Sequence, residues 1–390
     1  MFHPGLSLLG RSLCALLFAL CGTMPALAAP ATATAKWTVM VYISGDNDLE
    51  DYVVKDIEQE LAPTGSSADV QVVVLADRGP GYDTGRGNWE TTKLYHVTQG
   101  MFATPEAAVA DWGERNMGDA QTLIDFVTWT KANYPAEHYA LYFWGHGWNT
   151  HPGYTMSDDT NVDALDAPEL RNAQPALGFI DVVGYDGCNM ASVEVHKLWA
   201  GKATAVVASQ EYVNWDGLEY EKILPQLAAN PAMSADQLAA ISALSSQGNN
   251  ERTGSAIAVD ARHTTLYNAL DAWAKALRTA LTKERKNYVR AFGATRTFWQ
   301  VPYEKDLRDM VQEVNARVTN TAVRNTGTAL LAAIDQATVA KWSTNAYADA
   351  NGITIYQIDT AAQKDVYWTY YQGLGLVPAS WISFLDAYAK

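Results

Sequence analysis

The sequence predicts an α/β fold built on a mostly parallel β-sheet. Hydrophobic residues make up 48% of the 390 residues, as expected for a folded globular chain. Between residues 37 and 209, apolar runs of strand length alternate with segments of helical spacing. The joints between them are short, and strands connected through helices in this way lie parallel, with right-handed crossovers. The sequence therefore predicts a central sheet flanked by helices.

The N-terminal residues 1–29 precede this predicted fold and have the pattern of a secretory signal peptide. Arg11 supplies a positive charge, residues 13–20 are apolar, and residues 26–29 (ALAA) form a small-residue cleavage site. The apolar run is too short for a stable membrane anchor. We therefore expect an exported protein, periplasmic or secreted, with no membrane attachment once this segment is removed.

Strands and helices alternate through residues 37–220, which we take as the catalytic core. The predicted strands cover residues 37–44, 70–76, 92–97, 139–144, 179–185 and 203–209. The predicted helices cover residues 49–61, 118–133 and 190–200, and a Gly-rich loop covers residues 77–88.

The C-terminal part, residues 221–390, is richer in helix. Helices are predicted at residues 263–290, 304–318 and 327–341. Two strand-like runs, 255–259 and 352–358, are interpreted as edge or appended strands. We expect this part to complete the sheet and to pack on the core within a single enlarged domain.

Cys188 is the thiol that remains after residues 1–29 are removed, because Cys14 and Cys21 lie in that segment. Exported proteins normally pair their cysteines or avoid them. A lone thiol is therefore either a buried structural residue or a reactive group. Cys188 lies at a predicted strand-to-helix turn, where a helix N-terminus would lower the pKa of a thiol. This position favours a nucleophile.

His146 follows the predicted strand 139–144 and lies between Gly145 and Gly147. Ligands bind beyond the carboxyl ends of parallel strands, and neighbouring strands are about 4.8 Å apart. If the two strands are adjacent, His146 faces Cys188 and can act as its general base. The amides of Gly147 and Cys188 would then form an oxyanion hole. The alternative is a histidine that caps a strand end, and no third catalytic residue is evident.

Two segments carry a resemblance to a known family. Residues 134–147 (YPAEHYALYFWGHG) and 181–191 (DVVGYDGCNMA) resemble the His-Gly and nucleophile segments of the clostripain family of cysteine peptidases. Further similar segments at 42–50 (YISGDNDLE), 208–211 (ASQE) and 351–356 (NGITIY) follow in the family's order. The resemblance implies a caspase-like three-layer α/β sandwich. It also implies a Cys/His dyad that cleaves after Arg or Lys through a thioester acyl-enzyme.

Cleavage after basic residues implies an acidic S1 pocket. Asp186, two residues before Cys188, is the first candidate for its floor, and Asp216 is the second. A structural carboxylate that accepts backbone N–H groups is the alternative for Asp186. Some family members are activated by self-cleavage between the His and Cys segments. In this chain, Arg171 is the only Lys or Arg between His146 and Cys188. Arg171 is therefore the candidate self-cleavage site.

The family is also associated with Ca²⁺, although the chemistry itself requires no cofactor. Asp158, Asp159, Asp163 and Asp166 form an acidic stretch that could supply oxygen ligands. Solvated loop carboxylates are the alternative. Two other functions stay open: a metal-dependent hydrolase that uses His146, His151 and nearby acids such as Asp158, and a non-catalytic binding protein on a peptidase-like fold.

The chain is strongly acidic, with a net charge of −15. Removing residues 1–29 takes away one Arg and no acid, which leaves −16. Nucleic acid is excluded as a partner, because phosphate binding requires basic surface. Negative charge favours cationic ligands. The expected partners are protein or peptide substrates that contain Arg or Lys, and the sequence makes no prediction of oligomeric state.

Overall fold

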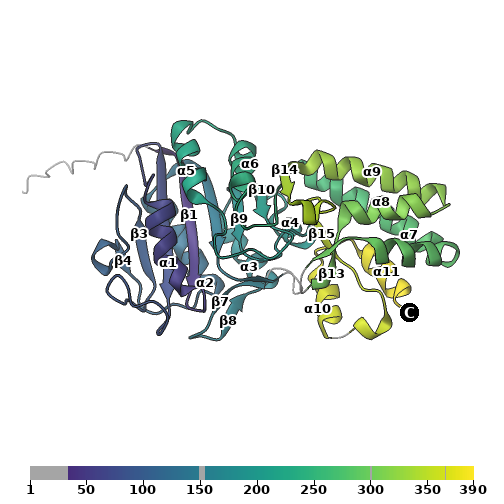
Figure 1. Ribbon diagram of the computed structural model, residues 1–390, viewed down its shortest axis with the longest axis horizontal. Helices are drawn as coiled ribbons and strands as arrows, with labels where there is room; N and C mark the ends of the chain where they lie inside the picture. The colour runs from purple at the N-terminus through teal and green to yellow at the C-terminus, as the bar shows by residue number, and fades with distance from the viewer. Residues whose placement is uncertain (1–33, 149–153, 299–300, 365) are drawn as a thin grey trace, which may run out of the picture. The chain divides into compact units, whose positions relative to one another are not determined.

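A nine-stranded sheet runs through the described part of the chain (Figure 1). The structure is a computed structural model and describes residues 34–148, 154–298, 301–364 and 366–390. The predicted signal peptide, residues 1–29, and His151 lie outside these ranges.

The strand order in the sheet is β14-β11-β10-β9-β5-β1-β2-β3-β4. The five central strands, β10 to β2 in this order, are mutually parallel, and each outer strand joins antiparallel to its neighbour. The strands are β1 (Ala35–Gly45), β2 (Val70–Arg78), β3 (Lys93–His96), β4 (Ala110–Asp111), β5 (Ala136–Trp144), β9 (Ile180–Asp186), β10 (Ala203–Ala208), β11 (Thr253–Ala258) and β14 (Thr338–Ser343).

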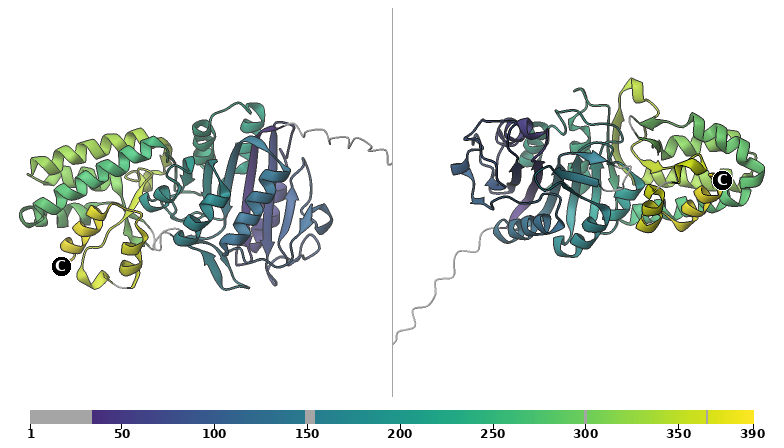
Figure 2. Two further views of the ribbon diagram at one scale, coloured as in Figure 1. Left: turned by 180° about the vertical axis from the view of Figure 1, so that it is seen from behind. Right: turned by 90° about the horizontal axis from the view of Figure 1, so that it is seen from below.

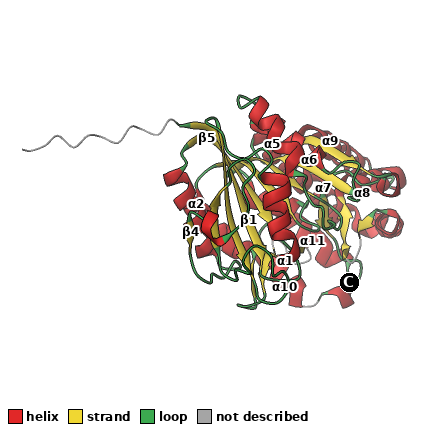
Figure 3. Cartoon of the chain, turned by 60° about the vertical axis from the view of Figure 1, so that its left-hand side comes forward, coloured by secondary structure: helices red, strands yellow, loops and turns green. Residues whose placement is uncertain are grey.

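Helices cover both faces of the sheet, as Figure 3 shows with helices in red and strands in yellow. One face packs against α1 (Glu50–Lys55), its π-helical continuation Asp56–Leu61, α5 (Tyr220–Ala229) and α6 (Ala235–Ser245). The other face packs against α2 (Ala120–Asn133), α3 (Ala167–Leu177) and α4 (Val193–Trp199). Each face has its own apolar cluster, so the predicted three-layer α/β sandwich is confirmed.

The C-terminal helices form a third apolar cluster, which also contains Val193 of α4 and Ile257 of β11. Figure 2 shows these green and yellow helices from two further sides. Trp273 and Trp381 stack at its centre, with ring centroids 6.1 Å apart. The helices are α7 (Ala261–Ala294), α8 (Leu307–Arg317), α9 (Thr321–Ala337), α10 (Val366–Leu374) and α11 (Ala379–Tyr388).

Two small antiparallel sheets accompany the main one. The first contains β6 (Gly147–Trp148), β7 (Tyr154–Asp158) and β8 (Asp163–Leu165), and it directly follows His146. The second contains β12 (Thr297–Phe298), β13 (Val301–Asp306) and β15 (Thr354–Tyr356).

Three sequence predictions in the C-terminal part were wrong in detail. The run 255–259, interpreted as an edge or appended strand, is appended to β10 as β11 but is not an edge, because β14 pairs with its other side. The edge strand β14 occupies Thr338–Ser343, where helix 327–341 was expected to end. Residues 304–306 belong to β13, and α8 begins only at Leu307, where the Asp306 carboxylate accepts the Asp309 N–H at 2.8 Å.

Within the described ranges, the helices are all too short or too polar to span a lipid bilayer.

Candidate active site

The strands that precede His146 and Cys188 are neighbours in the sheet. β5 and β9 are parallel and paired, with Trp144 opposite Asp186 at their carboxyl ends. His146 and Cys188 each follow two residues later, and the Gly145 N–H donates to the Asp186 carbonyl at 3.2 Å. The spatial relation expected from the sequence is therefore present: the two turns leave the same edge of the sheet side by side.

The turns around His146 and Cys188 pack closely through glycine. A Cβ atom on Gly147 would lie 2.6 Å from the Cys188 carbonyl oxygen and 3.0 Å from the Cys188 nitrogen. A Cβ atom on Gly187 would lie 2.6 Å from the Gly145 carbonyl oxygen. Only glycine allows this approach of one backbone to the other. The packing brings the backbones of Gly147 and Cys188 into close contact.

Both side chains line one cavity of about 470 Å³ at this edge. Its described lining contains the carboxylates of Asp48 and Asp186 and no Lys or Arg. Aromatic rings form much of the wall, and Tyr52 stacks on Trp215 with centroids 5.2 Å apart. The cavity therefore combines apolar surface with negative charge. Its aromatic lining residues are Tyr52, Trp144, Trp148, Tyr154, Tyr212 and Trp215.

The Cys188 thiol is half-buried and is held against the chain at Val213. Its Sγ lies 3.4 Å from the Val213 nitrogen and 3.6 Å from the Val213 oxygen, and among the described hydrogen bonds it has none to His146. Burial raises the pKa of the thiol to about 11, and the negative charges of Glu251, Glu211 and Asp186 add to the rise, while the Val213 N–H opposes it. The resting sulfur is therefore a neutral thiol.

This corrects the expectation that a helix N-terminus lowers the pKa of Cys188. Helix α4 begins only at Val193, behind an N-cap at Ser192, and has seven residues. The effect of a helix dipole falls off within the first turn. Desolvation and the nearby carboxylates therefore dominate the pKa of the thiol.

The residue after the thiol has an uncommon backbone conformation. Asn189 has a φ of 57°, in the left-handed region that asparagine tolerates better than most residues. Its N–H donates to the Glu211 carbonyl at 3.2 Å, and its side-chain amide donates to the Gln210 carbonyl at 3.0 Å. These bonds fix the turn against the segment that follows β10, so the position of Cys188 is set by two strands.

His146 has a carboxylate partner that the sequence interpretation missed. Its Nε2 lies 2.7 Å from Oδ1 of Asp48, and both side chains are accessible, with 43% and 62% of their surface exposed. Asp48 follows β1, which is the other neighbour of β5. Its place directly after a central parallel strand is the signal that could have identified it.

Asp186 lies at the end of β9 and lines the cavity with only 6% of its surface exposed. Its Oδ1 accepts the Leu218 N–H at 2.9 Å, and the buried Tyr220 hydroxyl also interacts with this carboxyl group and lowers its pKa. Burial raises the pKa of this carboxyl to about 7. Gly217 makes room for it, because a Cβ atom there would lie 2.4 Å from Oδ1 and the φ of Gly217 is 55°.

More buried carboxyl groups lie behind Asp186. Asp56 accepts the Trp144 indole N–H at 2.7 Å, and Glu60 accepts the Tyr220 N–H at 3.1 Å. Burial raises the pKa of Asp56 to about 8 and that of Glu60 to about 10, and Asp186 contributes to both shifts. Further acidic groups thus lie close to Asp186, although Asp56 and Glu60 are not among the residues that line the cavity.

The other sequence candidates lie elsewhere. Asp216 is not among the residues that line the cavity; its side chain is 43% exposed and lies 3.8 Å from the Lys55 ammonium. Arg171 lies within helix α3, where its guanidinium donates to the Leu374 carbonyl at 2.5 Å. Of the residues considered for a zinc site, His146 pairs with Asp48, Asp158 lies among other carboxylates, and His151 is outside the described residues.

Solved structures with the same fold are proteases. The fold is similar to that of a secreted C11 cysteine protease from Bacteroides thetaiotaomicron in complex with an irreversible peptide inhibitor. That match has a TM-score of 0.66 and 18% identity and covers 90% of this chain and 99% of that one. An inactive zymogen C11 protease from Parabacteroides distasonis matches with a TM-score of 0.64 and 18% identity, over 92% of this chain and 99% of that one. This chain therefore shares the fold of these C11 proteases.

The sequence profile of the clostripain family matches residues 41–387, and this chain belongs to that family of cysteine peptidases. A curated relative, clostripain from Hathewaya histolytica, is 28% identical over 223 residues. That alignment covers 50% of this chain and 42% of clostripain, so it spans less than half the length of that relative.

Proposed function

We propose that this chain is an exported cysteine endopeptidase that hydrolyses peptide bonds after Arg or Lys. One observation carries the proposal: a single cavity contains the Cys188 thiol, the His146 imidazole and the buried carboxyl group of Asp186. The first two groups supply a nucleophile and a base for acyl transfer. The third supplies a negative charge for a basic side chain of the substrate.

The reaction begins with transfer of the thiol proton to His146. With Nε2–H donating to Asp48, Nδ1 of His146 has the lone pair that accepts this proton. Cys188 Sγ leaves its contact with Val213, attacks the substrate carbonyl carbon, and the oxyanion binds at the amides of Gly147 and Cys188. The imidazolium then protonates the leaving amine as the C–N bond breaks. Water hydrolyses the resulting thioester, with His146 again as the base.

Specificity for a basic residue rests on Asp186. Its carboxyl group lines a cavity whose described lining contains no Lys or Arg, and the ammonium of Lys or the guanidinium of Arg would supply both hydrogen-bond donors and the opposite charge. The aliphatic stem of such a side chain can pack along the aromatic walls. Asp216, which is exposed and close to Lys55, is better suited to the rim than to the floor.

A peptide-library digest tests the proposal, with cleavage sites read by mass spectrometry. We expect cuts after Arg and Lys with the wild-type protein and none with Cys188→Ala. A library cut by the wild-type protein mainly after uncharged residues would contradict the specificity.

Asp48 is proposed as a positioning residue for His146. We expect Asp48→Asn to lower kcat by about 3- to 30-fold with KM changed less than about 2-fold, because the carboxylate orients the imidazole and stabilises its protonated form. Steady-state kinetics on one Arg-containing peptide measures both constants. Asp159→Asn, a substitution of another exposed acid nearby, is the control. If Asp48→Asn instead raised KM by such a factor and left kcat unchanged, Asp48 would contribute to substrate binding and not to the position of His146.

The buried carboxyl group of Asp186 predicts a pH-dependent stability. Its pKa of about 7 lies above the value of 3.8 that an exposed Asp has, so the folded protein binds this proton more tightly than the unfolded chain. The associated stability is complete below pH 3.8 and is lost as the pH rises through 7. We therefore expect Asp186→Asn to become progressively more stable than the wild type between about pH 4 and 7, by up to about 4 kcal/mol.

Thermal unfolding at several pH values measures this difference. Asp216→Asn, whose carboxylate is exposed, should show a difference from the wild type that is small at each pH. A stability difference for Asp186→Asn that is constant with pH would show that this carboxyl group is not strained by burial.

Two further expectations stay predictions. Self-cleavage at Arg171 would require helix α3 to unwind, because peptidases bind their substrates as extended chains and Arg171 lies within that helix. Export is supported by the signal-peptide pattern of residues 1–29 and by the similar Bacteroides thetaiotaomicron structure, which is that of a secreted protease.

A further inference from the structure

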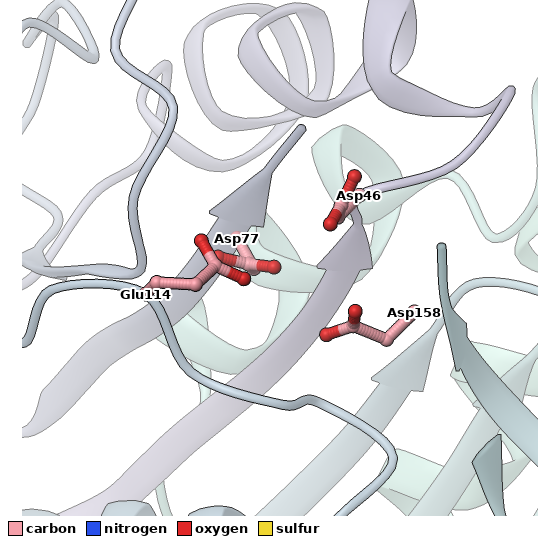
Figure 4. Close-up of side chains that lie close together, drawn as sticks. All are labelled: Asp46, Asp77, Glu114 and Asp158. Carbon is pink, nitrogen blue, oxygen red and sulfur yellow. The ribbon is translucent and has the colours of Figure 1, made fainter. Parts of the chain in front are cut away.

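A second group of acidic side chains lies beside the catalytic edge of the sheet. Asp46, Asp77, Glu114 and Asp158 each place a carboxylate oxygen within 4.8 Å of the others, and Figure 4 shows the four groups converging on one space. Asp46 follows β1, Asp77 is in β2 and Asp158 is at the end of β7. The four residues come from four separate segments of the chain.

Three of these carboxyl groups are buried, and none has a basic partner in the described part of the chain. Asp46, Asp77 and Asp158 are 2%, 0% and 1% exposed, whereas Glu114 is exposed. The ion pairs of the described residues include none of the four. Buried carboxylates without a cation are costly, because each loses its hydration. The arrangement therefore calls for positive charge.

Asp77 supplies the independent sign of a ligand. Its Oδ1 accepts the Thr92 hydroxyl at 2.6 Å, but its Oδ2 is fully buried and has no hydrogen-bond partner. Buried carboxylate oxygens are normally satisfied, so an orphaned one on a residue that converges with three other carboxyl groups needs an explanation.

Neighbouring groups hold the remaining acids in place and leave oxygens available. The Asp158 carboxylate accepts the Met117 N–H at 2.9 Å and the Asn161 N–H at 2.8 Å. Asp46 accepts the Thr160 N–H at 3.1 Å through Oδ2. Such second contacts orient carboxylates toward a metal.

We propose that Asp46, Asp77, Glu114 and Asp158 form a Ca²⁺ site. All four donors are hard carboxylate oxygens, which suit Ca²⁺ or Mg²⁺ and not Zn²⁺. Ca²⁺ binds oxygen at about 2.3–2.6 Å, so ligands on opposite sides of the ion are about 4.6–5.2 Å apart. Mg²⁺ requires about 4.0–4.2 Å and a near-ideal octahedron. The oxygens lie within 4.8 Å of one another, which a Ca²⁺ ion can bridge, and its flexible coordination suits a set of carboxylates better than the strict octahedron of Mg²⁺. The exposed side at Glu114 admits coordinating water.

Of the acidic stretch considered from the sequence, only Asp158 belongs to this site. Asp166 caps helix α3 by accepting the Glu169 N–H at 2.9 Å, and Asp163 accepts the Asn116 amide at 2.7 Å. Asp159 is exposed and is not one of the four converging acids.

The ion would join two segments that flank the catalytic histidine. Asp46 lies two residues before Asp48, the partner of His146, and the Asp46 carbonyl accepts the Asp159 N–H at 2.8 Å. Strand β7, which ends at Asp158, pairs with β6 directly after His146. Binding at this site would therefore hold the Asp48 turn and the His146 turn in one arrangement. This consequence rests on the proposed peptidase function, whereas the binding site does not.

Calorimetric titration with Ca²⁺ after EDTA treatment and desalting tests the site. We expect about one ion per chain, with a Kd between about 10⁻⁶ and 10⁻⁴ M, and a rise in Tm of about 3 °C or more in millimolar Ca²⁺. Asp77→Asn should weaken binding at least tenfold. Asp159→Asn, which changes the neighbouring exposed acid, should bind as the wild type does.

The metal-free stability of the variants separates lost binding from misfolding. Asparagine can still accept the Thr92 hydroxyl and carries no charge, so metal-free Asp77→Asn should unfold at or above the Tm of the metal-free wild type. Wild-type protein that gives neither heat nor a Tm shift in millimolar Ca²⁺ would overturn the proposal. Binding that is equally tight in Asp77→Asn would also overturn it. Neither readout depends on whether the protein cleaves peptides.

Discussion

Cys188→Ala is expected to abolish peptide hydrolysis, with kcat/KM lowered by about 10⁴-fold or more. The substitution removes the sulfur that forms the acyl-enzyme, and no other cysteine is present after residue 21. The half-buried thiol makes only weak contacts with Val213, so the fold should persist. Initial rates on an Arg-containing peptide measure the first effect, and thermal unfolding measures the second.

Two comparisons make this result interpretable. Cys188→Ser keeps the size of the side chain and should be nearly as inactive, because a hydroxyl is a far weaker nucleophile than a thiol. Wild-type protein treated with a chelator should still cleave the peptide through Cys188. Its rate should differ from that of the untreated protein only to the extent that a bound metal ion orients His146. Persistent cleavage by purified Cys188→Ala, lost on chelation, would point to the metal-dependent hydrolase instead.

Asp186→Asn is expected to lower kcat/KM for substrates with Arg or Lys at P1 by about 10²-fold or more. Truncating one partner of a buried charged pair costs about 2–5 kcal/mol, which corresponds to a factor of about 30 to 5,000. Substrates with an uncharged P1 residue should lose much less, so the ratio of the two kcat/KM values is the informative quantity. Paired peptides that differ only at P1 measure it.

Asp216→Asn is the matched control, because it removes the other candidate carboxylate without reaching the cavity floor. We expect it to change the same ratio by less than about 3-fold. If Asp186→Asn keeps the preference for Arg and Lys, the carboxyl group of Asp186 serves only the Leu218 N–H, which is the structural role considered from the sequence.

The order of elements in the core could be predicted from the sequence because each strand is a short apolar run that is buried on both faces. β1 and β2 are examples, with nearly continuous burial. Strand β14 could not be predicted in this way. Residues 338–343 (TVAKWS) are only partly buried, and their strand conformation comes from pairing with β11, which lies about 85 residues earlier in the chain. Local patterns do not contain such a pairing.

The residues of the site also fall into those that local sequence patterns identify and those that only the fold brings together. Cys188 and His146 stand out because each follows an apolar strand and a glycine. Asp48 is 98 residues from His146, and only the placement of β1 beside β5 brings the two together. The acidic cluster was equally hidden: the sequence drew attention to four acids close together in the chain, whereas the four that converge are spread from Asp46 to Asp158.

The neutral state of the resting sulfur would have a consequence if the protein is exported, as we propose, because it would then work outside the reducing cytoplasm. With a pKa of about 11, only about one molecule in 10⁴ carries a thiolate at pH 7. Oxidants attack thiolates far faster than thiols, so the unoccupied protein resists conversion to sulfenic acid or to mixed disulfides. In the proposed mechanism, the sulfur loses its proton only after a peptide fills the cavity and excludes water. The partial burial of the Cys188 thiol would thus protect the sulfur from oxidation between reactions.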